Sequence, residues 1–147
     1  MALAVVDASV VIKWFLAEED HEAARRLRED FLEGSLHLRV PSLLPYEVVS
    51  GLRFSRRFRA SELTEAARGL DRAGLVTVPL FGEYLEHAID LSIRHGVTIY
   101  DASYLALAAL QDCPLYTSDE ELLAKDSDDL RILHVREYGT GVGRAGG

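Results

Sequence analysis

Five short segments rich in apolar residues alternate with stretches of helical periodicity along these 147 residues, and this alternation limits the folds open to the chain. The first segment, Ala2–Val6, contains no polar residue, as expected of a strand buried on both faces. Parallel strands need long crossovers, which the intervening helices can provide. We therefore predict an α/β three-layer sandwich around a central, mostly parallel five-stranded sheet. Its strands are expected at 2–6, 36–40, 75–78, 114–117 and 130–135.

Polar capping residues and glycines predict where the helices begin and end. Side chains that satisfy the first helical turn are expected at Asp7, Ser61, Thr98 and Ser118. The helices themselves are expected at 8–16, 20–33, 61–73, 82–95, 99–110 and 118–125, with one more opening at 41–42.

The size and composition indicate one folded domain. Hydrophobic residues make up 48% and charged residues 27%, which excludes disorder, collagen-like repeats and a coiled coil for the whole chain. We expect one domain over 1–138 and a flexible, glycine-rich tail at 139–147. The tail has the pattern GxGxxG at 141–146, but one residue follows it, which leaves no helix to receive a dinucleotide.

The charge and the cysteine content bound the partners and the compartment. The formal net charge of −8 speaks against a basic nucleic-acid coat protein, but not against a nuclease whose carboxylates gather around cations. Cys113 is the single cysteine, so neither an internal disulfide nor a multi-thiolate zinc site is expected. The start lacks a basic secretion-signal segment, and Asp7 and Lys13 interrupt its apolar stretch. We expect a cytoplasmic protein without membrane contact.

Four carboxylates from four segments are placed to meet at one edge of the predicted sheet. Asp7 and Asp119 follow the first and fourth strands, and open parallel sheets bind ligands beyond their carboxyl ends. Asp101 opens a helix, while Glu47 lies beside an apolar stripe, where an unpaired carboxylate is costly. Such oxygen ligands suit Mg²⁺, or Mn²⁺ in its place. Helix capping alone is the alternative role for every one of them except Glu47.

Four segments resemble the motif blocks of PIN-domain ribonucleases, in the same order and spacing. They are VVDASVVIKWFL at 5–16, PSLLPYEVVSGL at 41–52, YDASYLALA at 100–108 and LYTSDEEL at 115–122. The resemblance covers nearly all of residues 2–135 and is above all to the VapC toxins of toxin–antitoxin pairs. It implies that four acids form a metal site supported by two hydroxyls, namely Asp7, Glu47, Asp101 and Asp119 with Ser9 and Thr117.

The resemblance implies metal-dependent hydrolysis of RNA that leaves 5′-phosphate and 3′-hydroxyl ends. Asp7 and Asp101 are then the main ligands, with Asp119 completing the shell partly through water. Glu47 is either a ligand or the acceptor of the attacking water's proton, and the number of metal ions stays open. A cognate antitoxin and a homodimer are also implied.

Other functions remain compatible with this sequence. A non-catalytic Mg²⁺-binding module, a PIN-type RNA-processing nuclease that is not a toxin and a nuclease acting on DNA stay open. A haloacid-dehalogenase-like phosphatase fits less well, because its chemistry needs a second aspartate where this chain has Ser9.

Positive charge for contact with RNA is concentrated after Glu47. No acid lies between Glu47 and Glu62, and the run between them either binds phosphates or is a solvated helix end. Its members are Arg53, Arg56, Arg57 and Arg59. The nearby aromatic residues at helical spacing are expected to lie mostly in the core, although some would line an antitoxin groove if the resemblance holds. They are Trp14, Phe15, Tyr46, Phe54 and Phe58.

Overall fold

Five parallel strands form one sheet in the order β3-β2-β1-β4-β5. The central strand β1 (Ala2–Val6) pairs with β2 (Leu36–Pro41) and β4 (Leu115–Thr117), while β3 (Val76–Val78) and β5 (Ile132–His134) form the edges. The predicted α/β architecture is confirmed, and every strand pairing is parallel. All five strands therefore end at the same edge, where the acids were expected.

The structure is a computed structural model that describes residues 2–140. The GxGxxG pattern and the rest of the predicted tail from residue 141 onward lie outside the described residues. No helix within 2–140 is long and apolar enough to cross a membrane.

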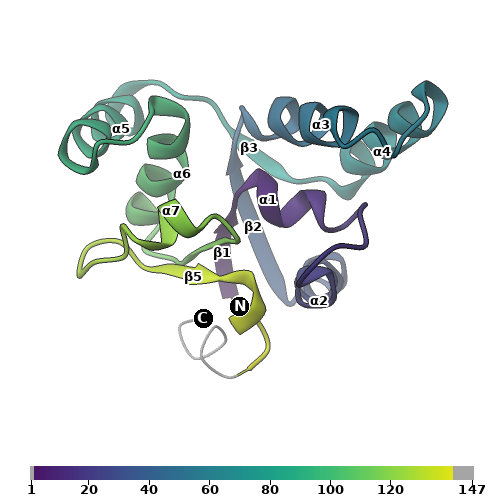
Figure 1. Ribbon diagram of the computed structural model, residues 1–147. Coiled ribbons are helices and arrows are strands. Elements are labelled where there is room, and N and C mark those ends of the chain that lie inside the picture. The colour runs from purple at the N-terminus through teal and green to yellow at the C-terminus, as the bar shows by residue number, and fades with distance from the viewer. Residues whose placement is uncertain (1, 141–147) are drawn as a thin grey trace.

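Helices cover both faces of the sheet, which gives three layers (Figure 1). On one side lie α1 (Ala8–Ile12), α2 (His21–Glu33), α3 (Leu44–Phe54) and α4 (Ala60–Ala73). On the other lie α5 (Gly82–His95), α6 (Ile99–Leu110) and α7 (Glu120–Leu123), and a 3-10 turn, Val135–Glu137, follows β5. The side changes after β3 because the chain reverses its direction across the sheet, and right-handed crossovers then place the helices on the opposite face.

The helix that carries Asp101 is held deep in the molecule. The residues of α6 from Ala102 to Ala108 are all buried, as its Ala- and Leu-rich sequence predicts. This helix packs across β1, β2 and β4. Asp101 is therefore fixed, through its helix, against the central strands.

The first and third helices approach closely at Gly51. A Cβ atom on Gly51 would lie 2.5 Å from Ile12 Cδ1, so a larger residue would require the end of the Ile12 side chain to move. The helix that follows Asp7 and the helix that carries Glu47 are therefore in direct contact at this point.

Three predicted helix boundaries are wrong on this side of the sheet. Helix α3, expected to open at 41–42, begins at Leu44, because Pro41 is still part of β2 and pairs with Val78. Helix α1 ends at Ile12 and continues as turns, so the regular helix is shorter than 8–16. Helix α4 begins at Ala60 with Arg59 as its N-cap, and Ser61 lies within the first turn. The capping partner is Glu62, whose Oε1 accepts a hydrogen bond from the Arg59 backbone N–H at 2.9 Å.

The predicted cap of the last helix is also wrong. Asp119, not Ser118, is the N-cap of α7, and its Oδ1 accepts a hydrogen bond from the Glu121 backbone N–H at 2.9 Å. The Ser118 N–H donates instead to Ser9 Oγ at 3.0 Å. The residue is thus held toward α1, and the helix starts one position later.

Candidate active site

Asp7 lies at the carboxyl end of β1, and only 6% of the residue is exposed. Ser9 Oγ donates a hydrogen bond to its Oδ1 at 2.5 Å, and Thr117 Oγ1 donates to its Oδ2 at 2.5 Å. The Val10 backbone N–H also points to Oδ1, at 3.4 Å, as expected of the N-cap of α1. Both carboxylate oxygens are therefore held by donors, and Asp7 caps its helix as well as facing the site.

Ser9 and Thr117 join the loops after β1 and β4 into one network. Their hydroxyl oxygens are 3.5 Å apart. Ser9 Oγ accepts from the Ser118 backbone N–H, and Thr117 Oγ1 accepts from the Asp119 backbone N–H at 2.9 Å. The structure thus brings both sequence-selected hydroxyls to the site, and it fixes the backbone of Asp119 beside Asp7.

Burial makes the Asp7 carboxylate difficult to ionise. The pKa of Asp7 rises from 3.8 to about 6, chiefly because the group is removed from water, and the charge of Asp119 raises it further. The hydrogen bonds from Ser9, Thr117 and Val10 act in the opposite direction. A cation at this edge would stabilise the ionised form of Asp7.

Asp101 faces the same space from α6. Its backbone N–H donates to Thr98 Oγ1 at 3.1 Å, which confirms Thr98 as the cap of that helix. Partial burial raises the pKa of Asp101 most, followed by the negative charges of Asp119, Glu47 and Glu121. The carboxylates therefore influence one another electrostatically, and Glu121 joins the set.

Glu47 has a partner that the sequence analysis missed. The hydroxyl of Tyr104 donates to Glu47 Oε1 at 2.6 Å, and Tyr104 is only 2% exposed. Burial, and then Glu47 itself, raise the pKa of Tyr104 far above its usual range. The available signal was the position of Tyr104 three residues after Asp101, on nearly the same face of a helix. A buried phenol thus satisfies the carboxylate beside the apolar stripe.

The donor set suits a hard divalent cation. It consists of carboxylates, and oxygen ligands are those that Mg²⁺ prefers. Within residues 2–140 no group of three or more His, Cys, Asp or Glu side chains is already spaced to hold a metal ion. Asp7 is fixed and buried, whereas Glu47, Asp101 and Asp119 are half-buried. The acids fit a metal site in chemistry and position. To bind one cation, the three half-buried side chains must move closer to Asp7.

Comparison with known proteins identifies the family. The model of the PIN domain matches residues 4–127. Over 126 residues the chain is 35% identical to Ribonuclease VapC3 of Pyrobaculum aerophilum, which covers 82% of this chain and 92% of that protein. This chain belongs to the VapC ribonucleases of the PIN-domain family. It is also 35% identical to Ribonuclease VapC1 of Mycobacterium tuberculosis over 141 residues, 90% of this chain and 97% of that one.

Solved structures resemble the fold of this VapC chain. The crystal structure of PAE2754 from Pyrobaculum aerophilum gives a TM-score of 0.61 at 26% identity, covering 89% of this chain and 90% of that one. VapBC2 from Rickettsia felis, bound to a DNA fragment from its promoter, gives 0.62 at 11% identity, covering 90% and 98%. The second likeness concerns the fold alone.

The arginine run of this VapC chain lies at the end of α3 and in the link to α4. Arg53, Arg56, Arg57 and Arg59 are all exposed. Arg59 Nε lies 3.2 Å from Glu62 Oε1, and the Arg53 guanidinium stacks over the Phe54 ring at 4.6 Å. Within residues 2–140, Arg53, Arg56 and Arg57 have no ion-pair partner. Three of the four positive charges are therefore available to an anionic ligand.

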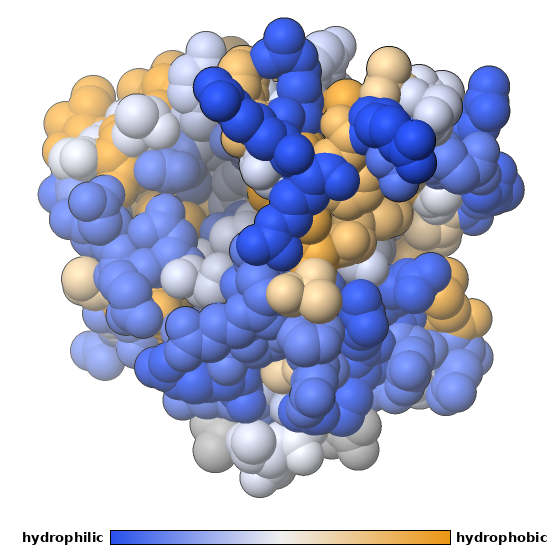
Figure 2. All heavy atoms as spheres, turned by 45° about the vertical axis from the view of Figure 1, so that its right-hand side comes forward, coloured by the Kyte–Doolittle hydropathy of each residue, from blue (hydrophilic) through white to orange (hydrophobic). Residues whose placement is uncertain are grey.

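The expectation that the aromatic residues lie in the core is only partly right. Trp14 is buried, and Phe15 and Phe58 pack against the core. Tyr46 and Phe54 on α3 are 78% and 67% exposed, because they occupy the face of that helix opposite its apolar stripe. On one face of the molecule, Figure 2 shows hydrophilic side chains, in dark blue, that lie against apolar surface, in orange.

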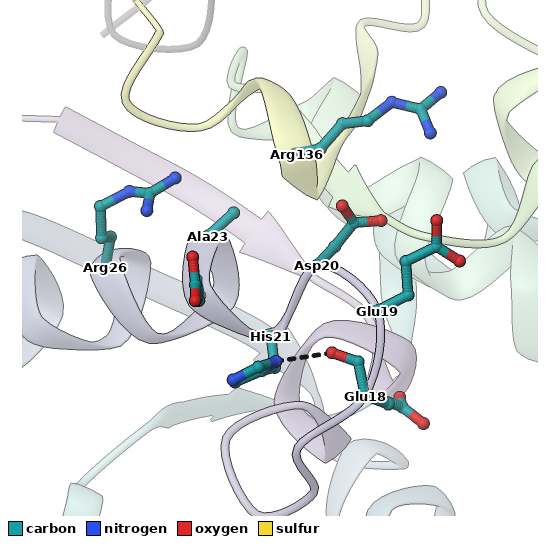
Figure 3. Close-up of a pocket in the computed structure, with 8 residues that line it drawn as sticks. Glu18, Glu19, Asp20, His21, Ala23, Arg26 and Arg136 are labelled. Carbon is teal, nitrogen blue, oxygen red and sulfur yellow. Dashed lines mark hydrogen bonds between the residues drawn. The ribbon is translucent and has the colours of Figure 1, made fainter.

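A separate pocket of about 370 Å³ lies between the start of α2 and the turn after β5 (Figure 3). It is lined by acids of the α1–α2 loop together with Arg26 and Arg136, and it contains none of the four site acids. His21 Nδ1 and the Glu18 carbonyl oxygen are 2.6 Å apart there. Nearby, the buried ring of His134 has its Nε2 atom 4.0 Å from both Asp20 and Glu120.

Proposed function

We propose that this chain is the toxin of a toxin–antitoxin pair and hydrolyses RNA with the help of Mg²⁺, or Mn²⁺ in its place. The observation that carries the proposal is the buried Asp7 carboxylate, held by two hydroxyls at an edge that three further acids share. Membership of the VapC ribonucleases supports the reaction. One structural neighbour is itself described as a member of the VapBC toxin–antitoxin family, and a toxin role here would extend that description to this chain.

Each site residue has a distinct part in the proposed reaction. Asp7, Asp101 and Asp119 would hold the cation, which when bound supplies the positive charge that activates water and offsets charge on the phosphate oxygens. Ser9 and Thr117 keep Asp7 oriented. Attack of water on phosphorus with departure of the 3′ oxygen leaves 5′-phosphate and 3′-hydroxyl ends.

Glu47 completes the site as a ligand or as the acceptor of the water's proton. The hydrogen bond from Tyr104 occupies its Oε1 atom, which leaves Oε2 for either task. The phenol would thus keep the carboxylate directed at the shared space.

The proposed binding partners are RNA, a cognate antitoxin and a second copy of the chain, all in the cytoplasm. The unpaired charges of Arg53, Arg56 and Arg57, with Arg59 beside them, would bind RNA phosphates. The exposed rings of Tyr46 and Phe54 supply apolar surface for a protein partner.

Cleavage of end-labelled RNA by the purified chain tests the reaction, with Mg²⁺ or Mn²⁺ against EDTA and with Asp101→Asn purified in parallel. We expect metal-dependent cutting that the variant loses by at least about 100-fold, since a ligand should matter more than its supporting shell. Mg²⁺ should raise the melting temperature of the wild type only. Metal-free Asp101→Asn should be at least as stable as the wild type, because one repelling charge is gone.

Other results would contradict specific parts of the proposal. A melting temperature raised by Mg²⁺ without cutting of any RNA favours a non-catalytic metal-binding module. If Asp101→Ala lowers the melting temperature equally with and without Mg²⁺, Asp101 acts in helix capping alone. Cutting of RNA without growth arrest when the chain is expressed alone favours a processing nuclease, and equal cutting of matched DNA removes the specificity for RNA.

A further inference from the structure

We propose that an apolar cavity beside the acids binds one unstacked pyrimidine base of the RNA, next to the bond that is cut. This inference rests on the proposed function. The cavity has a volume of about 140 Å³ and lies where β2 and β3 end and α6 begins. Its walls include Pro41, Ser42, Val78, Leu80, Ile99 and Tyr100.

The cavity is lined by residues that lie close in the chain to two of the four acids. Tyr100 directly precedes Asp101 in the first turn of α6. Leu43, which also lines the cavity, is one helical turn before Glu47, whose backbone N–H donates to its carbonyl at 3.3 Å. One turn of α-helix rises about 5.4 Å, so a base can enter the cavity while a phosphate of the same nucleotide lies at the acids.

The size and chemistry of the cavity suit a single six-membered ring. An apolar protein cavity of about 150 Å³ can hold a benzene molecule, so this one has room for a pyrimidine ring, whereas the fused rings of a purine would extend out of its open side. Tyr100 is 62% exposed, and its ring is available for stacking. Within residues 2–140 the Ser42 hydroxyl has no hydrogen-bond partner, so it can meet the polar edge of a base. Specific recognition of RNA commonly uses unstacked bases in this way.

Hydrogen bonds hold the walls of the cavity in place. The Ser42 backbone N–H donates to the Val78 carbonyl at 3.0 Å and joins the two sides. Ser103 Oγ donates to the Tyr100 carbonyl at 2.6 Å, and the Tyr84 hydroxyl donates to the Ser103 carbonyl at 2.7 Å. A base would thus enter a site that is already formed, which favours discrimination between bases.

Photo-crosslinking tests occupancy without requiring cleavage. Single-stranded RNA that contains 5-iodouridine is irradiated with the full chain in EDTA, and the attached peptide is identified by mass spectrometry. We expect attachment at Tyr100 and its loss in Tyr100→Ala. The matched control is Tyr46→Ala, since Tyr46 is also exposed and also precedes a site acid but does not line the cavity.

Cleavage of a random-sequence RNA pool then tests selectivity. With Mg²⁺ the wild type should prefer a pyrimidine at one fixed position beside the cut. Tyr100→Ala and the cavity-filling Val78→Phe should each weaken that preference about tenfold, the scale of one lost stacking contact, while Tyr46→Ala keeps it. Tyr100→Ala changes an exposed side chain, so a poorly folded Val78→Phe would not spoil the test.

The outcomes separate this inference from the proposed function. Crosslinking at Tyr100 without cleavage would support the base site and contradict hydrolysis. Cleavage with attachment elsewhere, or with an unchanged preference in both lining variants, would overturn the base site. Sedimentation gives a third outcome. If the wild type shows no base preference and forms a dimer that Tyr100→Ala or Val78→Phe dissociates, the cavity belongs to the contact with a second copy of the chain.

Discussion

The two halves of the candidate active site are built differently. On the side of β1 and β4, Asp7 is buried and both its oxygens are held by hydroxyls that are themselves bonded to the backbone. On the side of α3 and α6, Glu47 has one phenol as a partner, and Asp101 is half-buried among other negative charges. The first half is set before any ligand arrives, whereas the second can adjust.

One half of the site therefore holds its carboxylate in place, and the other half has carboxylates that can move. A fixed carboxylate gives a cation a defined position, and half-buried carboxylates can follow the ligand during a reaction. Four predictions test this difference. They begin with the buried side of Asp7 and end with the exposed arginines outside the site.

The free energy of unfolding of the metal-free protein should fall as the pH rises from about 4 to about 6. The pKa of Asp7 is 3.8 as a free group and about 6 in the fold, so in this window the folded state holds a proton that the unfolded state has lost. Stability therefore decreases with pH, by about 3 kcal/mol for this one group. Urea unfolding in EDTA at several pH values measures the slope. The slope should be smaller in Asp7→Asn, where Asp101, whose pKa is also raised, still contributes. A slope of equal size in that variant would mean that Asp7 does not cause it.

Thr117→Val should weaken Mg²⁺ binding by about 10- to 100-fold, the usual cost of losing a hydrogen bond that orients a ligand. The substitution keeps the shape of a buried side chain but removes the donor to Asp7 Oδ2. A titration of Mg²⁺ followed by calorimetry gives the affinity. Thr117→Ser keeps the hydroxyl and should restore most of the binding, and wild-type affinity in the valine variant would show that Asp7 needs no such support.

Tyr104→Phe should lower the cleavage rate about tenfold, which corresponds to one hydrogen bond to a charged group. The readout is kcat compared with KM, since loss of a group that orients Glu47 for the reaction should lower kcat and leave KM nearly unchanged. Tyr84→Phe is the matched control, since its hydroxyl is also buried but donates to a backbone carbonyl. Equal effects of the two variants on kcat would reduce Tyr104 to a packing role.

Arg56→Ala and Arg57→Ala should each weaken RNA binding a few-fold and reduce its dependence on salt. Each phosphate contact to a single strand contributes about 0.7 to the slope of log affinity against log salt concentration. Fluorescence anisotropy with labelled RNA in EDTA gives that slope. Arg59→Ala should change it less, because Glu62 already engages Arg59. Unchanged slopes in all three variants would leave the arginines as a solvated helix end.

The sequence was informative where the controlling interactions are local or repeat along the chain. The uninterrupted apolar run at Ala2–Val6 predicted the central strand, and the parallel order of the strands placed Asp7 and Asp119 at one edge. The place of Asp101 in the first turn of its helix followed from the predicted start of that helix at Thr98. The capping errors at Ser61 and Ser118 arose because a neighbouring side chain or loop competed for the same backbone groups.

The remaining features depend on contacts between distant segments. Tyr104 and Glu47 are 57 positions apart, and neither the periodicity nor the composition links them. The exposure of Tyr46 depends on which face of α3 meets α1. Gly51 lies at that contact, beside the Ile12 side chain. The cavity beside Asp101 is formed by three segments, so its volume could be found only after they were packed together.

The hydrogen bond from Thr117 to Asp7 spans 110 positions, and it has a consequence for how the protein is made. A ribosome adding about 5–20 residues per second produces Asp7 several seconds before Thr117 and Asp119. The central strand stays unpaired on its β4 side for all of that time. The nascent chain therefore acquires its complete set of acids only after Asp119 has been made, so the RNA being translated is not exposed to an assembled nuclease site until then.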